Sequence, residues 1–185
     1  MQQKGEPWYL HAGLYVIILI LVYLLIRVAI VEPQEVMEKE KYFKAESRLR
    51  MVNLREAENL WQSKFGKYTD KLDSLITFLK SSPLVEEAMN KVDSITGRPA
   101  NPFVKLSNGE YSWDSLAFTP KSHQPYTLKI DTSTNYDTVI DRRGKIVRID
   151  STIKIGSRYL IEDPDGYGKI GDLYNDALKN TASWE

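Results

Sequence analysis

The chain has 185 residues, its 25 Lys and Arg are balanced by 25 Asp and Glu, and it contains no cysteine. The balanced charge gives neither the basic footprint of a nucleic-acid-binding protein nor a polybasic lipid-binding tail, so no nucleic-acid partner is expected. The lack of cysteine excludes disulfides, thiolate metal sites and thiol catalysis.

A long apolar segment near the N-terminus predicts a single transmembrane helix over residues 10–31, after a short tail over residues 1–9. From position 12 to position 31 every residue except Arg27 is apolar, and a helix of about 20 residues matches the hydrocarbon thickness of a bilayer, about 30 Å. Trp8 and Tyr9 suit the aromatic belt at the membrane surface, and the Arg27 side chain can reach the headgroups. A cleaved signal peptide fits less well, because the run is long and no small-residue cleavage site follows it. The lipid bilayer is therefore the first expected partner.

The charges that flank this helix leave its orientation open. Lys4 is the only Lys or Arg before the helix, whereas several follow the helix: Lys39, Lys41, Lys44, Arg48 and Arg50. Counting Lys and Arg alone would place the C-terminal part inside the cell. Glutamates are interleaved with these cations, however, and the charges nearest to the membrane are acidic.

Residues 32–65 are predicted to continue as a helix, with a solvated stalk over 32–48. The segment has one proline and no glycine and is rich in good helix formers. Pro33 is compatible with a kink or with the start of a fresh helix. The second half carries an apolar stripe that is expected to pack on a sheet: Leu49, Val52, Ala57, Leu60, Trp61 and Phe65. Gly66 supplies a C-terminal cap.

Short helices and then strands are predicted for the rest of an α+β domain over residues 49–185. Leucine and isoleucine between positions 72 and 79 follow helical spacing, and Ser82 with Pro83 opens a further helix. After an irregular connection over 96–109, alternating residues predict strands near 126–131, 138–140, 145–149 and 158–161, of which the middle two form a hairpin. The predicted fold class is thus a transmembrane helix that extends into a long amphipathic helix packed on a C-terminal antiparallel sheet.

The sequence does not contain a recognisable catalytic signature. Its two histidines are His11, at the membrane boundary, and His123, in a polar loop flanked by prolines, and neither is close in sequence to a suitable Ser or Asp. Glycine-rich phosphate loops and HExxH are also missing. We therefore expect a non-enzymatic protein and disfavour an enzyme of unknown chemistry.

The segment 163–172 is the strongest candidate for a ligand site. Asp163, Asp165, Gly168 and Ile170 match positions one, three, six and eight of a calcium loop, and Asp172 adds a third carboxylate. Tyrosines at positions 167 and 174 replace two of the usual oxygen ligands, so an Asp- and Gly-rich turn after a strand is the favoured alternative. Calcium is the one candidate cofactor.

The layout and a few motifs resemble the type IV pilin-like proteins, and most closely the major pseudopilin of type II secretion. The matching motifs are LREAENLW at 54–61 and FGKYT at 65–69, followed by the spaced leucines Leu72 and Leu75. Pseudopilins show a similar R-x-A-x-x-x-Y motif and then G-x-Y-P. The segment 163–172, before the terminal residues 183–185, is similar to the calcium-holding tail of that family.

This resemblance implies a cytoplasmic N-terminus and a periplasmic or otherwise extracytoplasmic domain on the inner (cytoplasmic) membrane. It also implies a structural or accessory role in a secretion, pilus-like or other envelope assembly, with envelope proteins as partners and self-association through the N-terminal helix. Leu10 stands where the family has the glutamate of its cleavage and assembly signature after Gly5. Neither prepilin processing nor ordinary filament assembly is therefore expected. The alternative is a membrane-tethered binding module in which the 163–172 loop, with or without calcium, recognises a ligand.

Overall fold

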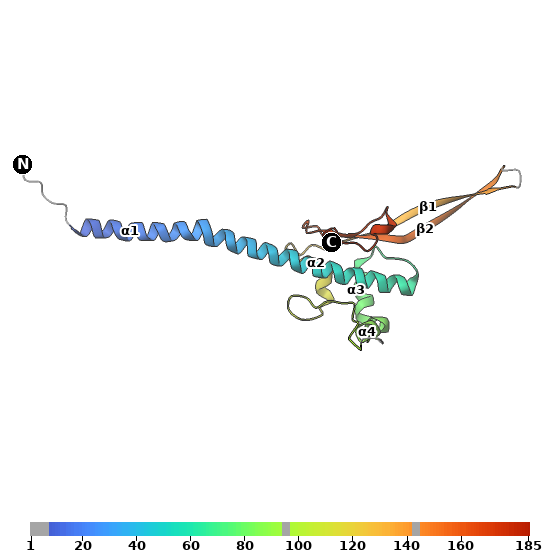
Figure 1. Cartoon of the computed structure of the whole chain (residues 1–185), viewed down its shortest axis with the longest axis horizontal. Helices are drawn as coiled ribbons and strands as arrows, with labels where there is room; N and C mark the ends of the chain where they lie inside the picture. Colours follow the sequence, from blue (N-terminus) through green and yellow to red (C-terminus); the bar gives the residue numbers. More distant parts are fainter. Residues whose placement is uncertain (1–7, 94–96, 142–144) are drawn as a thin grey trace, which may run out of the picture. The chain divides into compact units, whose positions relative to one another are not determined.

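The structure is a computed structural model that describes residues 8–93, 97–141 and 145–185. It is α+β, with a long apolar N-terminal helix and a small antiparallel sheet (Figure 1). This much of the predicted fold class is confirmed. The chain divides into two compact units, Met1–Phe43 and Lys44–Glu185.

The apolar segment forms a helix that passes through Pro33 by a local change of winding. Helix α1 (Trp8–Ile26) is followed by a π-helical turn, η1 (Arg27–Val31), and then by α2 (Glu32–Phe65). At the end of η1 the Glu32 amide donates to the Arg27 carbonyl, five residues back. Pro33 explains this turn, because proline has no N–H to donate and its ring crowds the carbonyl four residues earlier. The helix therefore neither stops at Pro33 nor starts afresh there.

The N-terminal helix exposes apolar side chains all round. No residue of α1 is buried. Within the described part of the chain, the helix that begins at Trp8 is the one helix long and apolar enough to cross a membrane. A helix that is apolar on every face needs either a protein core or lipid around it. The N-terminal segment is therefore compatible with a membrane span.

The second half of α2 places one face in the core of the second unit. Met51, Leu54 and Ala57 are fully buried. Of these three only Ala57 belongs to the predicted stripe, and four further residues of that stripe are partly buried against this core: Leu49, Val52, Leu60 and Trp61. Phe65 is 49% exposed, at the edge of the face. The buried face also reaches back to Glu46 and Ser47, within the stretch predicted as a stalk.

Two short helices follow, the first predicted by the spacing of its apolar residues and the second by Ser82 and Pro83 at its start. Helix α3 (Leu72–Ser81) buries Leu75, Ile76, Phe78 and Leu79, and α4 (Pro83–Met89) begins with its proline at the first position. The irregular connection after them ends in a short 3₁₀ turn, η2 (Asp114–Ala117). Asn53 on α2 fixes this connection, because its side-chain amide donates to the Val104 carbonyl and accepts from the Val104 amide, both at 2.8 Å.

The sheet has three antiparallel strands in the order β1-β2-β3: β1 (Thr127–Ile140), β2 (Ile146–Glu162) and β3 (Lys169–Gly171). Thr138 pairs with Ile149, so the predicted hairpin is confirmed. The segments predicted as separate strands are joined into two long strands, with a register irregularity between Ile130 and Thr132. A second 3₁₀ turn, η3 (Asp176–Leu178), precedes the C-terminus.

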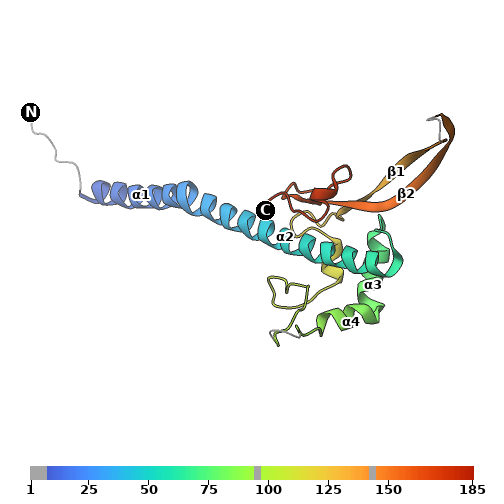
Figure 2. The same cartoon turned by 45° about the vertical axis from the view of Figure 1, so that its right-hand side comes forward.

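Helix and sheet share one core, which lies at the base of the sheet. Leu128 pairs with Ile161 and Ile130 with Tyr159, and these residues join the buried cluster that contains the α2 residues. The Tyr159 ring packs against Tyr68, with ring centroids 4.6 Å apart. Figure 2 shows β1 and β2 running on past this base, beyond the end of α2.

Candidate functional site

A buried polar network joins the Asp163 loop to α2. The Ser47 hydroxyl donates to Oδ2 of Asp163, and the Tyr126 hydroxyl lies 2.8 Å from the same Ser47 oxygen. Ser47 and Tyr126 are buried, and Asp163 is only 7% exposed. Burial raises the pKa of Tyr126 far above its ordinary value, and the Asp163 charge adds to this effect although the Ser47 hydrogen bond opposes it. The phenol therefore stays protonated and acts as a neutral hydrogen-bonding group.

Asp163 also organises its own turn. Its Oδ1 accepts from the Asp165 amide at 2.7 Å, and its backbone carbonyl accepts from the Gly166 amide at 3.0 Å. The Asp163 amide in turn donates to the Gly168 carbonyl at 3.1 Å. An aspartate that caps the amides after it is the signature of an Asx turn. These contacts hold the Asp- and Gly-rich turn that follows β2.

The other two aspartates of the predicted calcium site serve different segments. Asp165 accepts from the Ser122 amide at 3.2 Å, in the loop before β1. Burial alone would raise the pKa of Asp165, but hydrogen bonds from Ser122 and Thr119 and the charge of Lys121 lower it overall. Asp172 accepts from the amides of Tyr174 and Asn175, at 2.7 and 2.8 Å, and these two bonds lower its pKa.

The three carboxylates thus accept hydrogen bonds from different amides. Among the described residues, no group of three or more His, Cys, Asp or Glu side chains is arranged to hold a metal ion. The predicted site of Asp163, Asp165 and Asp172 therefore gains no support as a calcium site.

The C-terminal residues close onto α2 beside this loop. The Arg48 guanidinium lies over the Trp184 ring, 4.8 Å from its centroid, and donates to the Tyr167 carbonyl at 3.3 Å. Gly168 has a φ of +146°, and a Cβ there would lie 2.5 Å from the Trp184 ring. The glycine is required because the tryptophan packs directly on the loop backbone.

Glu58 is a buried acid that the sequence analysis missed. Its side chain has 0% exposure, and Oε2 accepts from the Thr69 amide at 3.1 Å. Oε1 has no hydrogen-bond partner among the described residues. Burial raises the pKa of Glu58 to about 8, the Thr69 bond partly opposes the rise, and the Asp70 charge adds to it. The signal that could have revealed it is its helical spacing, seven residues after Met51 and four after Leu54.

The predicted membrane-anchor residues lie at the two ends of the apolar segment. Trp8 and Tyr9 begin α1 and are exposed, and Arg27 begins the π-helical turn that follows it. The two histidines occupy separate elements, His11 on α1 and His123 in the loop before β1. His123 adopts a left-handed φ of 54°, as the tight loop between prolines requires.

No protein-family model, curated protein or solved structure matches the chain. The fold itself defines the class, an α+β protein with one long apolar N-terminal helix compatible with a membrane span.

Proposed function

We propose that this protein is a non-catalytic, single-pass membrane protein that acts as a structural or accessory subunit of a bacterial envelope assembly, of the secretion or pilus-like kind. Its N-terminus is cytoplasmic, and its α+β domain lies outside the inner membrane. Lateral contacts with other membrane proteins come from the N-terminal helix and the surface of the domain.

The proposal depends most on α1, an apolar helix whose side chains are not buried by the rest of its unit. Monomeric soluble proteins rarely expose a contiguous apolar patch of more than a few hundred Å², whereas α1 is apolar on every face and has no buried residue. A bilayer covers such a surface, and a helix satisfies its own backbone hydrogen bonds there. The same helical run continues as α2, whose second half contributes to the core of the domain.

The residues that carry the pilin-like resemblance have structural contacts, which supports a pilin-like domain. The Tyr68 ring is buried, and the Tyr68 amide donates to the Gly156 carbonyl at 2.9 Å, which ties the loop after α2 to β2. Arg55 reaches the C-terminal segment, with Nη1 3.3 Å from the Asn180 carbonyl and 3.5 Å from the Glu185 carboxylate. Ala57, on α2 with Arg55, is fully buried.

The polar groups of the domain support a structural role over a catalytic one. Ser47, Asp163 and Asp165 join separate segments by hydrogen bonds and are thereby committed to the fold. The alternative of a tethered binding module with a calcium loop is weaker, since its three carboxylates have separate partners. Leu10, in the place of the assembly glutamate, fits a subunit that stays uncleaved in the membrane.

The proposal is tested on the full chain in its own membrane. Cells that carry a C-terminal tag are treated with a lysine-reactive cross-linker, extracted with mild detergent and fractionated by size. We expect a particle larger than one chain that contains envelope proteins in fixed proportion. A matched variant with Leu21→Arg and Leu24→Arg, which disrupts the apolar segment, should lose both the membrane fraction and the particle. A stable membrane protein that runs as one chain without any envelope partner would contradict the proposal.

A further inference from the structure

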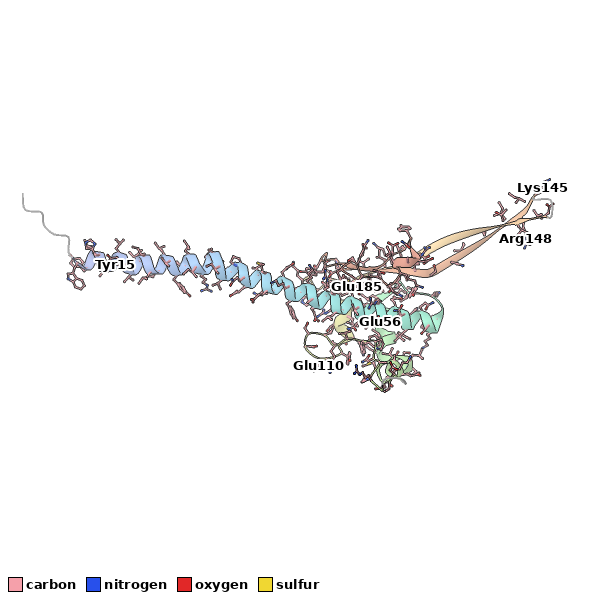
Figure 3. All side chains as sticks on the ribbon, viewed as in Figure 1. Tyr15, Glu56, Glu110, Lys145, Arg148 and Glu185 are labelled. Atoms are coloured by element: carbon pink, nitrogen blue, oxygen red, sulfur yellow. The ribbon has the colours of Figure 1, made fainter. Side chains whose placement is uncertain are left out.

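The outer part of the β1–β2 hairpin extends beyond the core. We call this part the arm, and it comprises residues 132–140 of β1 and 146–155 of β2. Figure 3 shows Lys145 and Arg148 at its outer end, away from the helices of the same unit. The register remains antiparallel along the arm, from Thr132 opposite Ile155 to Thr138 opposite Ile149.

One face of the arm is uncharged and apolar. Ile149, Ile153 and Ile155 lie at alternate positions of β2, where its register with β1 is unbroken, and they are 59%, 63% and 54% exposed. Among the residues with described side chains, those that share their face are Ser151 on β2 and, by cross-strand pairing, Thr132 and Thr138 on β1. Charged residues with described side chains, Arg148 and Lys154, lie at the other positions of β2, on the opposite face.

This apolar face continues the core face of the sheet. Alternation along β1 puts Thr132 on the same side as Leu128 and Ile130, which pack against the core. At the base of the sheet that side is covered by α2, but along the arm the described aliphatic side chains remain exposed. A two-stranded hairpin alone is at best marginally stable in water. The arm therefore requires a cover that the domain itself does not provide.

We infer that this apolar face is a homotypic contact surface, which packs against the same face of a second copy of the chain. In a two-fold interface each surface meets itself, so a charged face would set like charges against one another. A face of Ile, Thr and Ser avoids this repulsion. Two such sheets pack face to face about 10 Å apart, with interdigitated aliphatic side chains.

The size of the face limits the strength of the contact. From Ile149 to Ile155 the strand is about 20 Å long, and two strands are about 10 Å wide, which gives a footprint of about 200 Å² per copy. Stable protein interfaces bury about 800 Å² per partner. The contact is thus too small to hold free domains together, but it can form between copies concentrated in one membrane, where the effective concentration is high. To this extent the inference depends on the proposed membrane anchor.

The chain has no native cysteine, so a single introduced cysteine reports on this contact without background. Ser151 lies between Ile149 and Ile153 on this face, and a two-fold axis through this part of the face brings it next to its own copy. Because a disulfide needs the two Cα atoms closer than about 7 Å, the full-length Ser151→Cys protein in membranes is treated with a short bismaleimide, and cross-linked dimer is followed on denaturing gels. Lys154→Cys is the matched control, because it lies three residues away on the opposite face of the same strand.

We expect Ser151→Cys to form dimer at least tenfold faster than Lys154→Cys. In the Ser151→Cys background, Ile153→Lys should abolish the dimer by setting like charges in the contact, whereas Lys154→Glu should leave it unchanged. Equal rates for the two cysteines would overturn the inference, because they indicate random collision. It is also overturned if Ser151→Cys remains monomeric, is shielded by lipid from a water-soluble maleimide, or links to a different protein. If any of these results is obtained while the membrane-bound envelope particle is still present, the homotypic contact is refuted but the proposed function is not.

Discussion

The Thr69 amide donates a hydrogen bond to Oε2 of Glu58, 3.1 Å away, and so joins the loop after α2 to a carboxyl group that has no exposed surface. Burial of this group raises its pKa from 4.5 to about 8. Between these two values the folded chain holds a proton on Glu58 that the unfolded chain releases. The contribution of Glu58 to stability is therefore complete below pH 4.5 and is lost as the pH rises toward 8.

We predict that Glu58→Gln removes this pH dependence. The amide is neutral at every pH and keeps an oxygen for the Thr69 amide, so the variant should gain stability over the parent as the pH rises from 6 to 9. The slope for one group is at most about 1.4 kcal/mol per pH unit. Urea unfolding followed by tryptophan fluorescence measures the free energy of unfolding of each variant at each pH. Glu87→Gln, at an exposed position on α4, is the control and should follow the parent; parallel curves for Glu58→Gln and the parent would refute the assignment.

The second prediction concerns Asp163 as a structural group. Replacing it with alanine removes the acceptor of Ser47 and of the Asp165 amide, and a buried donor left unpaired costs about 1–3 kcal/mol. We expect Asp163→Ala to lower the free energy of unfolding by about 2 kcal/mol or more, and Asp172→Ala, at a more exposed turn, to lower it less.

Millimolar calcium provides the matching test of the loop. Because the carboxylates of Asp163, Asp165 and Asp172 already accept hydrogen bonds from separate segments, calcium should leave the melting temperature of the parent unchanged. A rise in the parent that disappears in Asp163→Ala would instead establish a metal site.

The sequence was most informative where one physical signal dominated. The apolar run predicted the N-terminal helix, and the leucine and isoleucine spacing predicted α3. The alternation of residues on either side of Ile140 and Lys145 predicted the hairpin. The full length of the strands was missed because β1 and β2 continue to pair beyond Ile130, where the core ends. On β1 the residues that follow Ile130 are mostly polar, so backbone pairing leaves no clear mark in the sequence there.

The core face of α2 was only partly predictable, because polar residues lie within it. Met51 and Leu54 are fully buried beside Asn53 and Glu58, and the latter two interrupt the apolar pattern that a helical stripe requires. Their burial depends on partners distant in sequence, Val104 and Thr69. In the same way, the alternate aspartates of 163–172 do not reveal which amides each carboxylate caps.

The third prediction separates two effects of glycine. Gly109 and Gly171 both have left-handed φ values, +80° and +87°, but only at Gly171 would a Cβ collide with backbone, at the carbonyl oxygen of Tyr159. Gly109→Ala should therefore cost about 1 kcal/mol from conformation alone. Gly171→Ala should cost more than about 3 kcal/mol, because β3 must move away from β2. Equal losses in denaturant unfolding would show that the close approach at Gly171 is not rigid.

The fourth prediction tests the clamp between Asn53 and Val104. Asn53→Ala leaves both the amide and the carbonyl of Val104 without their side-chain partner, so a loss of about 2–4 kcal/mol is expected. Asn59→Ala on the same helix removes only a long 3.5 Å contact to Glu56 and should cost less than about 1 kcal/mol. If the two variants melt at the same temperature, Asn53 does not hold the 97–113 connection.

The central claim is that the apolar helix spans the inner membrane and carries the domain to its outer side. The most direct measurement is a reporter enzyme, active only outside the cytoplasm, fused after Glu185 of the full chain. We expect an active fusion that remains in the membrane pellet after alkaline washing. A stably produced fusion that is inactive, or that alkaline washing releases, would contradict it.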